Sequence, residues 1–269
     1  MDENQNMAAD NANLAIPAAT MVIMHRDSGG GHPKLLMMER AVSMAFAGGA
    51  AVFPGGKVDP ADTDFAAALD DSVTLGLALD EAAARLAAIR ETLEEAGLAL
   101  GLFGAEDPGE CQIARAALHD GAPLSEICAA YGWTPDLRKL VPWARWRPPA
   151  FERVSRVFDT RFYLVDAGDT ELNAVVDATE NTRLFWASAR DVLSLADEGK
   201  VKIIFPTRRN LERLALFDSY SAAAAHAAVH PVETVLTFID RRADGDYLCI
   251  PQGHGYPVTE EPLTRAQRG

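Results

Sequence analysis

The chain has 269 residues, of which 48% are hydrophobic and 24% charged, and its formal net charge is −14. This composition is typical of a globular protein with enough apolar side chains for a substantial core. The excess of acidic residues argues against non-specific nucleic-acid binding, which depends on clustered Lys and Arg. An acidic chain can still bind an anionic phosphate ligand when divalent metal ions lie between its carboxylates and the ligand.

The sequence contains no apolar run of the ~20 residues that a membrane-spanning helix needs. Its start is acidic and polar, the opposite of the basic-then-apolar order of a signal peptide. We therefore expect a cytoplasmic protein. Three widely spaced cysteines lack any Cys-x-x-Cys pattern, which predicts small buried side chains rather than a zinc site or disulfides.

In chain order, we expect residues 1–15 to form a disordered tail and residues 16–269 to form a single domain. In the first part of this domain, we expect a hairpin of two strands with the sequences AATMVIMHR and KLLMMER. A short apolar strand then ends abruptly at Pro54-Gly55-Gly56, within VFPGG. The Ala- and Asp-rich segment near 61–79 predicts a helical insertion.

The clearest helix of the chain has the sequence DEAAARLAAIRETLEEAG. Asp80 is the expected N-cap, and Gly97 is expected to end the helix. Apolar residues recur at three- and four-residue spacing, which predicts one buried stripe.

After this helix, we expect a second helical insertion near 109–133 and then two strands, VPWARW and DTRFYLVDA. The C-terminal part predicts the helices SARDVLSLADEG and TRRNLERLALFDSYSAAAAHAA, followed by the hairpin ETVLTFIDRRADGDYLCIP. These elements together predict a mixed α/β domain with helical insertions.

Three glutamates, Glu91, Glu94 and Glu95, share one face of the clearest helix, because residues three and four apart are neighbours on a helix surface. Their mutual repulsion and the helix macrodipole both disfavour this cluster near the C-terminal end. Each effect is only tenths of a kcal/mol to about 1 kcal/mol when exposed. Spacing alone therefore leaves open both a solvated acidic patch and a metal site, in either case outside the apolar core.

The wider pattern resembles the signature of the Nudix hydrolases, which is Gly, five residues, Glu, seven residues, then Arg-Glu-apolar-x-Glu-Glu-x-Gly-apolar. The second half matches at Arg90, Glu91, Glu94, Glu95, Gly97 and Leu98, with Thr92 at a position that is usually aliphatic. The VFPGG strand is also similar to the family and assigns the signature glycine to Gly56. Arg90 follows Gly56 by 34 positions where the signature expects 14, so an insert removes the first glutamate from its register.

A long insert at this point is similar to the branch that includes the coenzyme A diphosphatases. The resemblance implies a Nudix-type α/β/α sandwich with a mixed sheet, and metal-dependent hydrolysis of a nucleoside diphosphate linked to another group. Coenzyme A or its thioesters are the favoured substrates. NADH, ADP-ribose or nucleotide sugars are the alternative, as is a non-catalytic nucleotide-binding protein on the same fold. We expect no nucleic-acid or membrane partner, and a homodimer is left open.

The resemblance also implies Mg²⁺ or Mn²⁺, held by Glu91, Glu94 and Glu95 together with the backbone carbonyl of Gly56. Arg90 would pair with Glu94 across one helical turn. Glu180, six residues before Trp186, would supply a further carboxylate or remain a solvated loop residue. The candidates for binding substrate phosphates are Arg40, Arg145 and Arg161. Each arginine has an alternative structural role in an ion pair.

Overall fold

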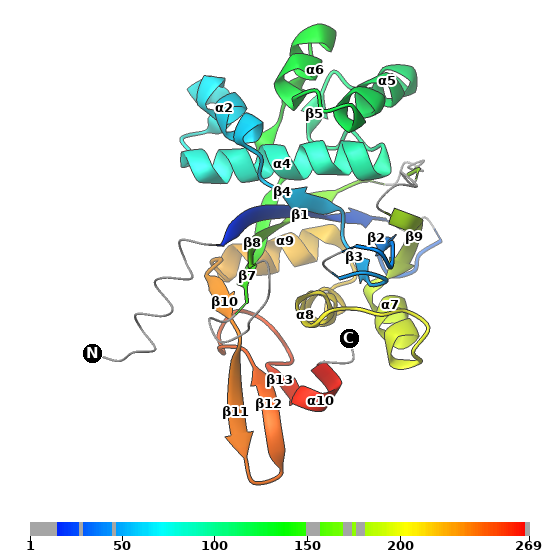
Figure 1. Cartoon of the computed structure of the whole chain (residues 1–269), viewed down its shortest axis with the longest axis vertical. Coiled ribbons are helices and arrows are strands. Elements are labelled where there is room, and N and C mark those ends of the chain that lie inside the picture. The colour runs from blue at the N-terminus through cyan, green and yellow to red at the C-terminus, as the bar shows by residue number, and fades with distance from the viewer. Residues whose placement is uncertain are drawn as a thin grey trace, which may run out of the picture.

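The computed structural model describes residues 15–26, 29–44, 47–148, 157–168, 174–175 and 181–266. Its centre is an eight-stranded sheet (Figure 1). The strands are β1 (Ile16–His25), β2 (Lys34–Arg40), β3 (Ala51–Val52), β4 (Gly55–Lys57), β7 (Val141–Arg147), β8 (Phe158–Asp166), β9 (Asn181–Ser188) and β10 (Thr234–Leu236). Their order is β10-β7-β8-β1-β2-β3, with β4 paired to β1 and β9 to β2. The sheet is mixed, because β1 runs parallel to β8 and antiparallel to β2.

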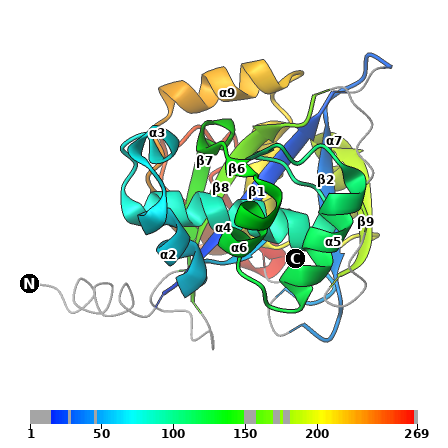
Figure 2. The same cartoon turned by 90° about the horizontal axis from the view of Figure 1, so that it is seen from above.

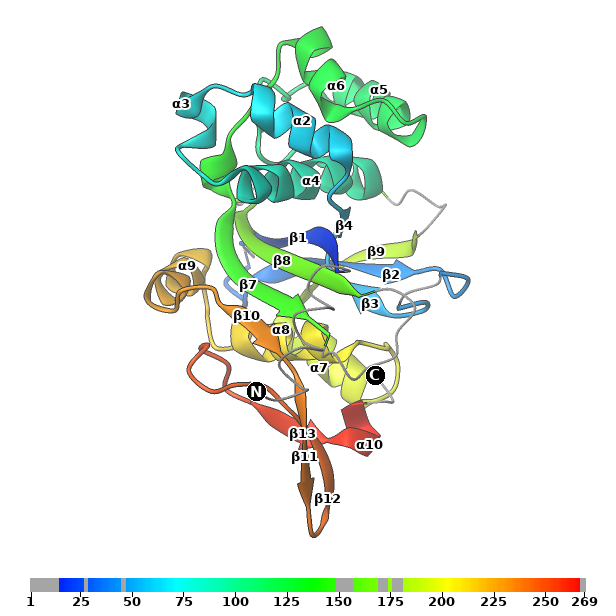
Figure 3. The same ribbon diagram turned by 60° about the vertical axis from the view of Figure 1, so that its left-hand side comes forward.

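Helices cover both faces of this sheet. On one face, α4 (Leu79–Ala96) packs against β1, and further helices form a second layer beyond it (Figure 3). These outer helices are α2 (Pro60–Ala68), α3 (Asp71–Thr74), α5 (Pro108–His119) and α6 (Leu124–Tyr131). On the other face lie α7 (Ala189–Asp197) and α8 (Phe205–Leu214). Seen from above, α9 (Tyr220–Val229) lies beside β7 and β8 (Figure 2).

Because side chains alternate along β1, this one strand contributes residues to two apolar clusters on opposite faces of the sheet. Ala19, Met21 and Ile23 belong to the apolar cluster under α4, whereas Val22 and Met24 belong to the cluster that α7, α8 and α9 cover. Successive strand residues point to opposite faces, so a strand that is buried on both sides is apolar throughout. The predicted mixed α/β sandwich is therefore confirmed.

Smaller elements complete the chain. A two-stranded sheet joins β5 (Leu102–Phe103) to β6 (Thr134–Pro135), and a short 3₁₀ helix spans Leu137–Lys139. The predicted C-terminal hairpin is found as β11 (Phe238–Arg242) and β12 (Gly245–Cys249), extended by β13 (Glu260–Pro262) and followed by α10 (Leu263–Ala266). None of the helices in the described ranges is long and apolar enough to cross a membrane.

Some predicted element boundaries are wrong. The helix expected from 207 onward is two helices, because the Ser219 side chain accepts a hydrogen bond from the Ala222 N–H and starts α9 anew. The insertion near 61–79 likewise contains two helices. Ala78 rather than Asp80 is the N-cap of α4, and Asp80 lies in its first turn. The predicted tail, apart from Ala15, lies outside the described residues, and the single-domain organisation stays a prediction.

Candidate active site

The end of α4 is held close to the glycine strand β4. An apolar stripe packs α4 against β1, and Gly97 ends the helix in the left-handed conformation, with φ 70°. Strand β4 pairs with β1 so that Gly56 lies opposite Ala19. The last two turns of α4 therefore face β4, and the Gly55 N–H donates a hydrogen bond of 2.8 Å to Glu95 Oε2.

Two glycines permit this close approach. A Cβ atom at Gly56 would collide with the carboxylate of Glu91. Gly55 has a φ of 152°, and a Cβ there would collide with the backbone of β1. A side chain at Gly56 would displace the Glu91 carboxylate, and one at Gly55 would push β4 away from β1. The expected proximity of Gly56 to the acidic turn is therefore observed.

At Glu91 and Glu95, burial outweighs the positive charges nearby, which are those of Arg90 and Arg40. Burial, with a smaller contribution from the Glu91 charge, raises the pKa of Glu95 to about 8 despite the opposing Gly55 hydrogen bond. Burial, with a smaller contribution from the Glu94 charge, raises the pKa of Glu91 to about 7 despite the opposing Arg90 charge. Glu95 is only 5% exposed, so its expected position outside the core is wrong. Two buried, mutually repelling carboxylates are suited to a divalent cation, which prefers oxygen donors.

Glu94 is arranged differently from its two neighbours. Its Oε2 lies 3.4 Å from Arg90 Nη1, and its Oε1 lies 3.6 Å from His119 Nδ1. Within the part of the chain that the structure describes, no three His, Cys, Asp or Glu side chains are gathered closely enough to hold a metal ion. The structure therefore brings Glu91 and Glu95 to the glycine strand, and it places Glu94 in contact with Arg90 and His119.

Arg90 connects the acidic turn to the start of the insert. Its guanidinium donates to Asp62 at 3.0 Å, to the Lys57 carbonyl at 2.9 Å and to Glu91 at 3.0 Å. Burial lowers the pKa of Arg90, but the Asp62 hydrogen bond and the Glu91 and Asp62 charges outweigh it and raise the pKa above its usual value. The predicted pair with Glu94 is present, but it is longer than the contacts to Asp62 and Glu91.

Asp62 is the site residue that the sequence prediction missed. It is 2% exposed, and as the third residue of α2 it also forms a capping box with Asp59. Five residues separate it from Gly56, the spacing that the signature requires for its first acidic residue. The 20-residue excess therefore falls entirely between Asp62 and Arg90. Counting forward from the glycine would have identified Asp62, with Asp in place of Glu.

Comparisons with known proteins show the family of this chain. The family model of the NUDT19 Nudix domain matches residues 64–214, more than half of the chain. The chain belongs to the NUDT19 Nudix family. It is 26% identical over 280 residues to the acyl-coenzyme A diphosphatase NUDT19 of Gallus gallus, covering 85% of this chain and 74% of that protein. The human acyl-coenzyme A diphosphatase NUDT19 is also 26% identical, over 81% of this chain and 71% of its own.

The crystal structure of a Nudix hydrolase from Alicyclobacillus acidocaldarius is similar in fold and sequence. It superposes with a TM-score of 0.65 and 28% identity, over 78% of this chain and 96% of that chain. The expected fold and enzyme class, a Nudix diphosphatase on an α/β/α sandwich, are therefore confirmed.

Three further residues of this Nudix domain support the acidic turn. Asn181, at the start of β9, is 1% exposed and donates its amide to Glu95 Oε1 at 3.3 Å. Arg115 on α5 donates to the backbone carbonyls of Glu94 and Glu95 at 2.8 Å and 2.9 Å. His119, also on α5, contacts Glu94. Neither spacing nor motif marked these residues, because each comes from an element remote in sequence.

The candidate phosphate-binding arginines lie in different places. Arg40 ends β2, and its charge lowers the pKa of Glu95, which places it beside the acidic turn. Arg161 pairs with Asp80 and Glu81, and Arg145 makes a two-pronged ion pair with Asp159.

Asp80 lies at the far end of α4, about 16 Å along the helix axis from Glu91 at 1.5 Å per residue. The structure therefore brings Arg40 to the carboxylates and holds Arg145 and Arg161 in ion pairs elsewhere. Glu180 lies outside the described residues.

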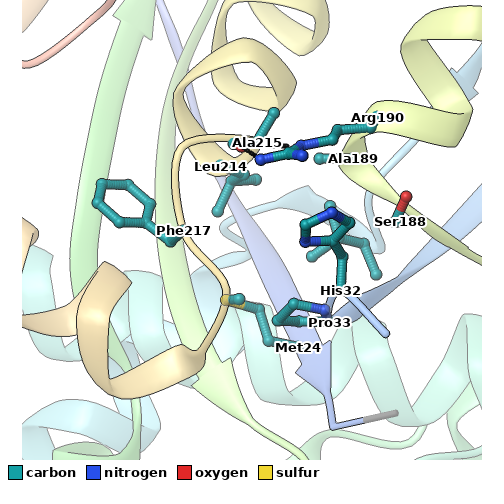
Figure 4. Close-up of a pocket in the computed structure, with 10 residues that line it drawn as sticks. Met24, His32, Pro33, Ser188, Ala189, Arg190, Leu214, Ala215 and Phe217 are labelled. Atoms are coloured by element: carbon teal, nitrogen blue, oxygen red, sulfur yellow. Dashed lines mark hydrogen bonds between the residues drawn. The ribbon is translucent and has the colours of Figure 1, made fainter. Parts of the chain in front are cut away.

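One pocket lies away from this site (Figure 4). Met24, Leu35 and Phe217 line it, and His32 at its rim pairs with Asp218 at 2.8 Å. The pocket lining includes Ser188, which lies opposite Lys34 at one end of the paired strands β2 and β9. Asn181, which contacts Glu95, lies opposite Arg40 at the other end of the same strands. The two ends are about 20 Å apart at ~3.3 Å per residue. This pocket is therefore separate from the acidic turn.

Proposed function

We propose that this Nudix hydrolase cleaves the diphosphate linkage of coenzyme A or its thioesters. The observation that carries the proposal is the buried pair of Glu91 and Glu95 against the Gly55-Gly56 strand. Similarity to two proteins named acyl-coenzyme A diphosphatases, over more than four fifths of this chain, supports the choice of substrate.

Mg²⁺ or Mn²⁺ is the proposed cofactor, because hard divalent cations prefer carboxylate and carbonyl oxygens. Glu91 and Glu95 would hold the ions, with Glu94 and the Gly56 carbonyl completing the set. The raised pKa values of Glu91 and Glu95 fit this assignment, because burial outweighs the Arg90 and Arg40 charges and a bound cation would offset it. When bound, the ions would offset the negative charge of the diphosphate during phosphoryl transfer.

The chain's own residues orient the carboxylates and move a proton. The Gly55 N–H and the Asn181 amide fix Glu95, and Arg90 fixes Glu91. One acidic side chain, from this turn or Glu180, takes a proton from the attacking water. The water oxygen then forms a bond to one phosphorus while the bridging P–O bond breaks and the second phosphate leaves. Arg40 is the arginine proposed to bind a substrate phosphate, and Arg145 and Arg161 remain weaker candidates.

A panel of substrates tests this proposal and its alternatives. Purified protein would be incubated with Mg²⁺ and coenzyme A, an acyl-coenzyme A, NADH, ADP-ribose or a capped dinucleotide. We expect the coenzyme A compounds to give the highest kcat/KM and to release a 3′,5′-ADP product. A higher kcat/KM for NADH or ADP-ribose would transfer the assignment to that class. Tight binding without turnover of any member would favour a non-catalytic binding protein.

A further inference from the structure

Helix α5, in the second insertion, brings two polar side chains to the end of α4. Arg115 and His119 are four residues apart and so share one face of α5. Arg115 donates to the backbone carbonyls of Glu94 and Glu95 at 2.8 Å and 2.9 Å. His119 Nδ1 lies 3.6 Å from Glu94 Oε1. The insertion therefore contacts both the backbone and a side chain of the acidic turn.

Packing between α4 and α5 fixes the place of His119. Ala114 and Leu118, on α5, are buried in the same apolar cluster as the last apolar residues of α4. At the end of α4, a Cβ atom added to Gly97 would lie 3.4 Å from Arg115 Nη1, so α5 approaches the helix end closely. His119 directly follows Leu118 as the last residue of α5. Its backbone is therefore held beside Glu94 by a helix with a buried face.

Glu94 lies between two nitrogen groups. Its Oε2 is 3.4 Å from Arg90 Nη1, and its Oε1 faces His119 Nδ1. The Arg90 guanidinium makes shorter contacts, of 3.0 Å, with Asp62 and Glu91. Nδ1 presents an N–H to the carboxylate both in a protonated ring and in the neutral tautomer with hydrogen on Nδ1. His119 therefore contacts Glu94 from outside α4 and restricts where its carboxylate can point.

We propose that His119 is a positioning residue of the proposed metal site, where it holds the Glu94 carboxylate for a divalent cation. Carboxylates that bind metal ions are in turn held by other polar groups, and loss of such a group lowers metal affinity or activity about 10- to 100-fold. A carboxylate oxygen has more than one lone pair, so Oε1 can face His119 and still bind a cation. The inference rests on the metal binding in the proposed function and not on the choice of substrate.

Mn²⁺ alone is the probe for the first test. Free Mn²⁺ would be measured by electron paramagnetic resonance during titration of the full chain at a single pH, for the wild type, His119→Leu and His119→Asn. We expect His119→Leu to weaken Mn²⁺ binding about ten-fold or more. His119→Asn should keep most of the affinity, because the asparagine amide places an N–H near the position of Nδ1.

His32→Leu is the matched control, because His32 also makes an ion-pair contact, with Asp218, but lies at the separate pocket. Its Mn²⁺ affinity should equal that of the wild type. The melting temperature of each metal-free variant would show whether the fold persists.

The outcomes separate this inference from the proposed function. Wild-type Mn²⁺ affinity in His119→Leu would overturn the inference and leave the proposed function standing. An equal loss of affinity in His119→Leu and His119→Asn would also overturn it, since packing rather than the N–H would then be responsible. Failure of the wild type to bind Mn²⁺ would refute the proposed metal site, and this inference with it.

A second test needs no variant that must fold like the wild type. Long-range proton–nitrogen NMR spectra of the wild-type histidine rings would be recorded during titration with Mg²⁺. We expect the His119 Nδ1 resonance to shift as Mg²⁺ binds and the His32 ring to stay unchanged. An unchanged His119 ring, with Mg²⁺ binding evident from the backbone amides of the acidic turn, would refute the role of His119.

Discussion

Glu91 and Glu95 are electrostatically strained in the candidate active site, because burial and a neighbouring carboxylate raise the pKa of each. Hydrogen bonds from the Gly55 N–H and the Asn181 amide reduce this strain at Glu95 without removing it. A carboxylate kept in such a place is typical of a site that gains its charge balance from a ligand. Substitution should therefore separate function from stability.

Replacing Glu95 with Gln should lower kcat by a factor on the order of hundreds or more, because a neutral amide cannot balance a divalent cation. The fold should persist, since Gln keeps one oxygen to accept the Gly55 N–H hydrogen bond. Steady-state kinetics with Mg²⁺, together with the melting temperature of the metal-free variant, would measure both effects. Near-normal turnover would remove Glu95 from the mechanism.

Asp62 should contribute to stability through its ion pair with Arg90. In Asp62→Asn the buried Arg90 loses its closest anionic partner but keeps those to Asp59, Glu91 and Glu94. Removing one member of a buried pair costs 3–5 kcal/mol, and the remaining partners reduce this here to about 2 kcal/mol. Urea denaturation would measure the loss in free energy of unfolding.

Asp64→Asn is the matched control for this substitution, because Asp64 is an exposed residue of the same helix. We expect its free energy of unfolding to stay within about 0.5 kcal/mol of the wild type. An equal loss of unfolding free energy in the two variants would show that the Asp62–Arg90 ion pair contributes no more to stability than an exposed aspartate does.

At the scale of elements, α5 supplies hydrogen-bond donors to the C-terminal end of α4. The last carbonyls of a helix lack intrahelical partners, and Arg115 supplies donors to two of them, Glu94 and Glu95. The second insertion therefore stabilises the turn that carries the proposed catalytic carboxylates.

Arg115→Met should lower the free energy of unfolding by about 1–3 kcal/mol, since hydrogen bonds to a charged donor are worth ~1.5–3 kcal/mol each and water can replace part of them. It should also lower kcat by loosening Glu94 and Glu95. Chemical denaturation and kinetics on the same preparation would measure the two effects. Gln112→Met, at an exposed position of α5, is the control and should change neither. Unchanged kcat in Arg115→Met would confine α5 to a structural role.

At the scale of the whole molecule, the acidic turn should link stability and pH to the proposed metal binding. The folded pKa values of Glu91 and Glu95, about 7 and about 8, exceed the ordinary value of 4.5. Between about pH 4.5 and 8 the folded state therefore binds more protons than the unfolded state, and the contribution of this pair to stability falls as pH rises. A metal ion must displace these protons, so its affinity should rise over the upper part of the same range.

We expect Mn²⁺ or Mg²⁺ to raise the melting temperature more at about pH 8.5 than at about pH 6. Thermal unfolding with the metal, and with a chelator in its place, would measure the difference at each pH. A Glu91→Gln/Glu95→Gln double variant should show almost no metal effect at either pH. An equal metal effect in the wild type at both pH values would contradict the coupling.

The two faces of the central sheet are chemically distinct. On one face, the carboxylates of α4 lie next to the glycine backbone of β4. On the other face, Arg213, a buried arginine of α8, lies near histidines. The carboxylates lie on α4 and the arginine lies on α8, and these two helices cover opposite faces of the sheet. The chain can therefore hold groups of opposite charge without direct contact between them.

Local pattern was sufficient to predict α4, its end at Gly97, the hairpin of β1 and β2, and the acidic turn. Each of these depends on residues within a few positions of one another, through helix periodicity, strand alternation or the freedom of glycine. The resemblance of VFPGG to the family, and not the spacing, led us to expect Gly56 beside the acidic turn. The division of the later helices was missed, since capping by Ser219 competes with the helix propensity of the surrounding alanines.

Only the tertiary structure decided which remote residues complete the candidate site. Asn181 reaches Glu95 because β9 pairs with β2, and Arg115 reaches α4 because the second insertion folds back over it. The same packing holds Arg145 and Arg161 in ion pairs away from the carboxylates. Sequence spacing determines neighbours along one helix or strand, whereas contacts between elements arise from the burial of apolar faces, which no local pattern specifies.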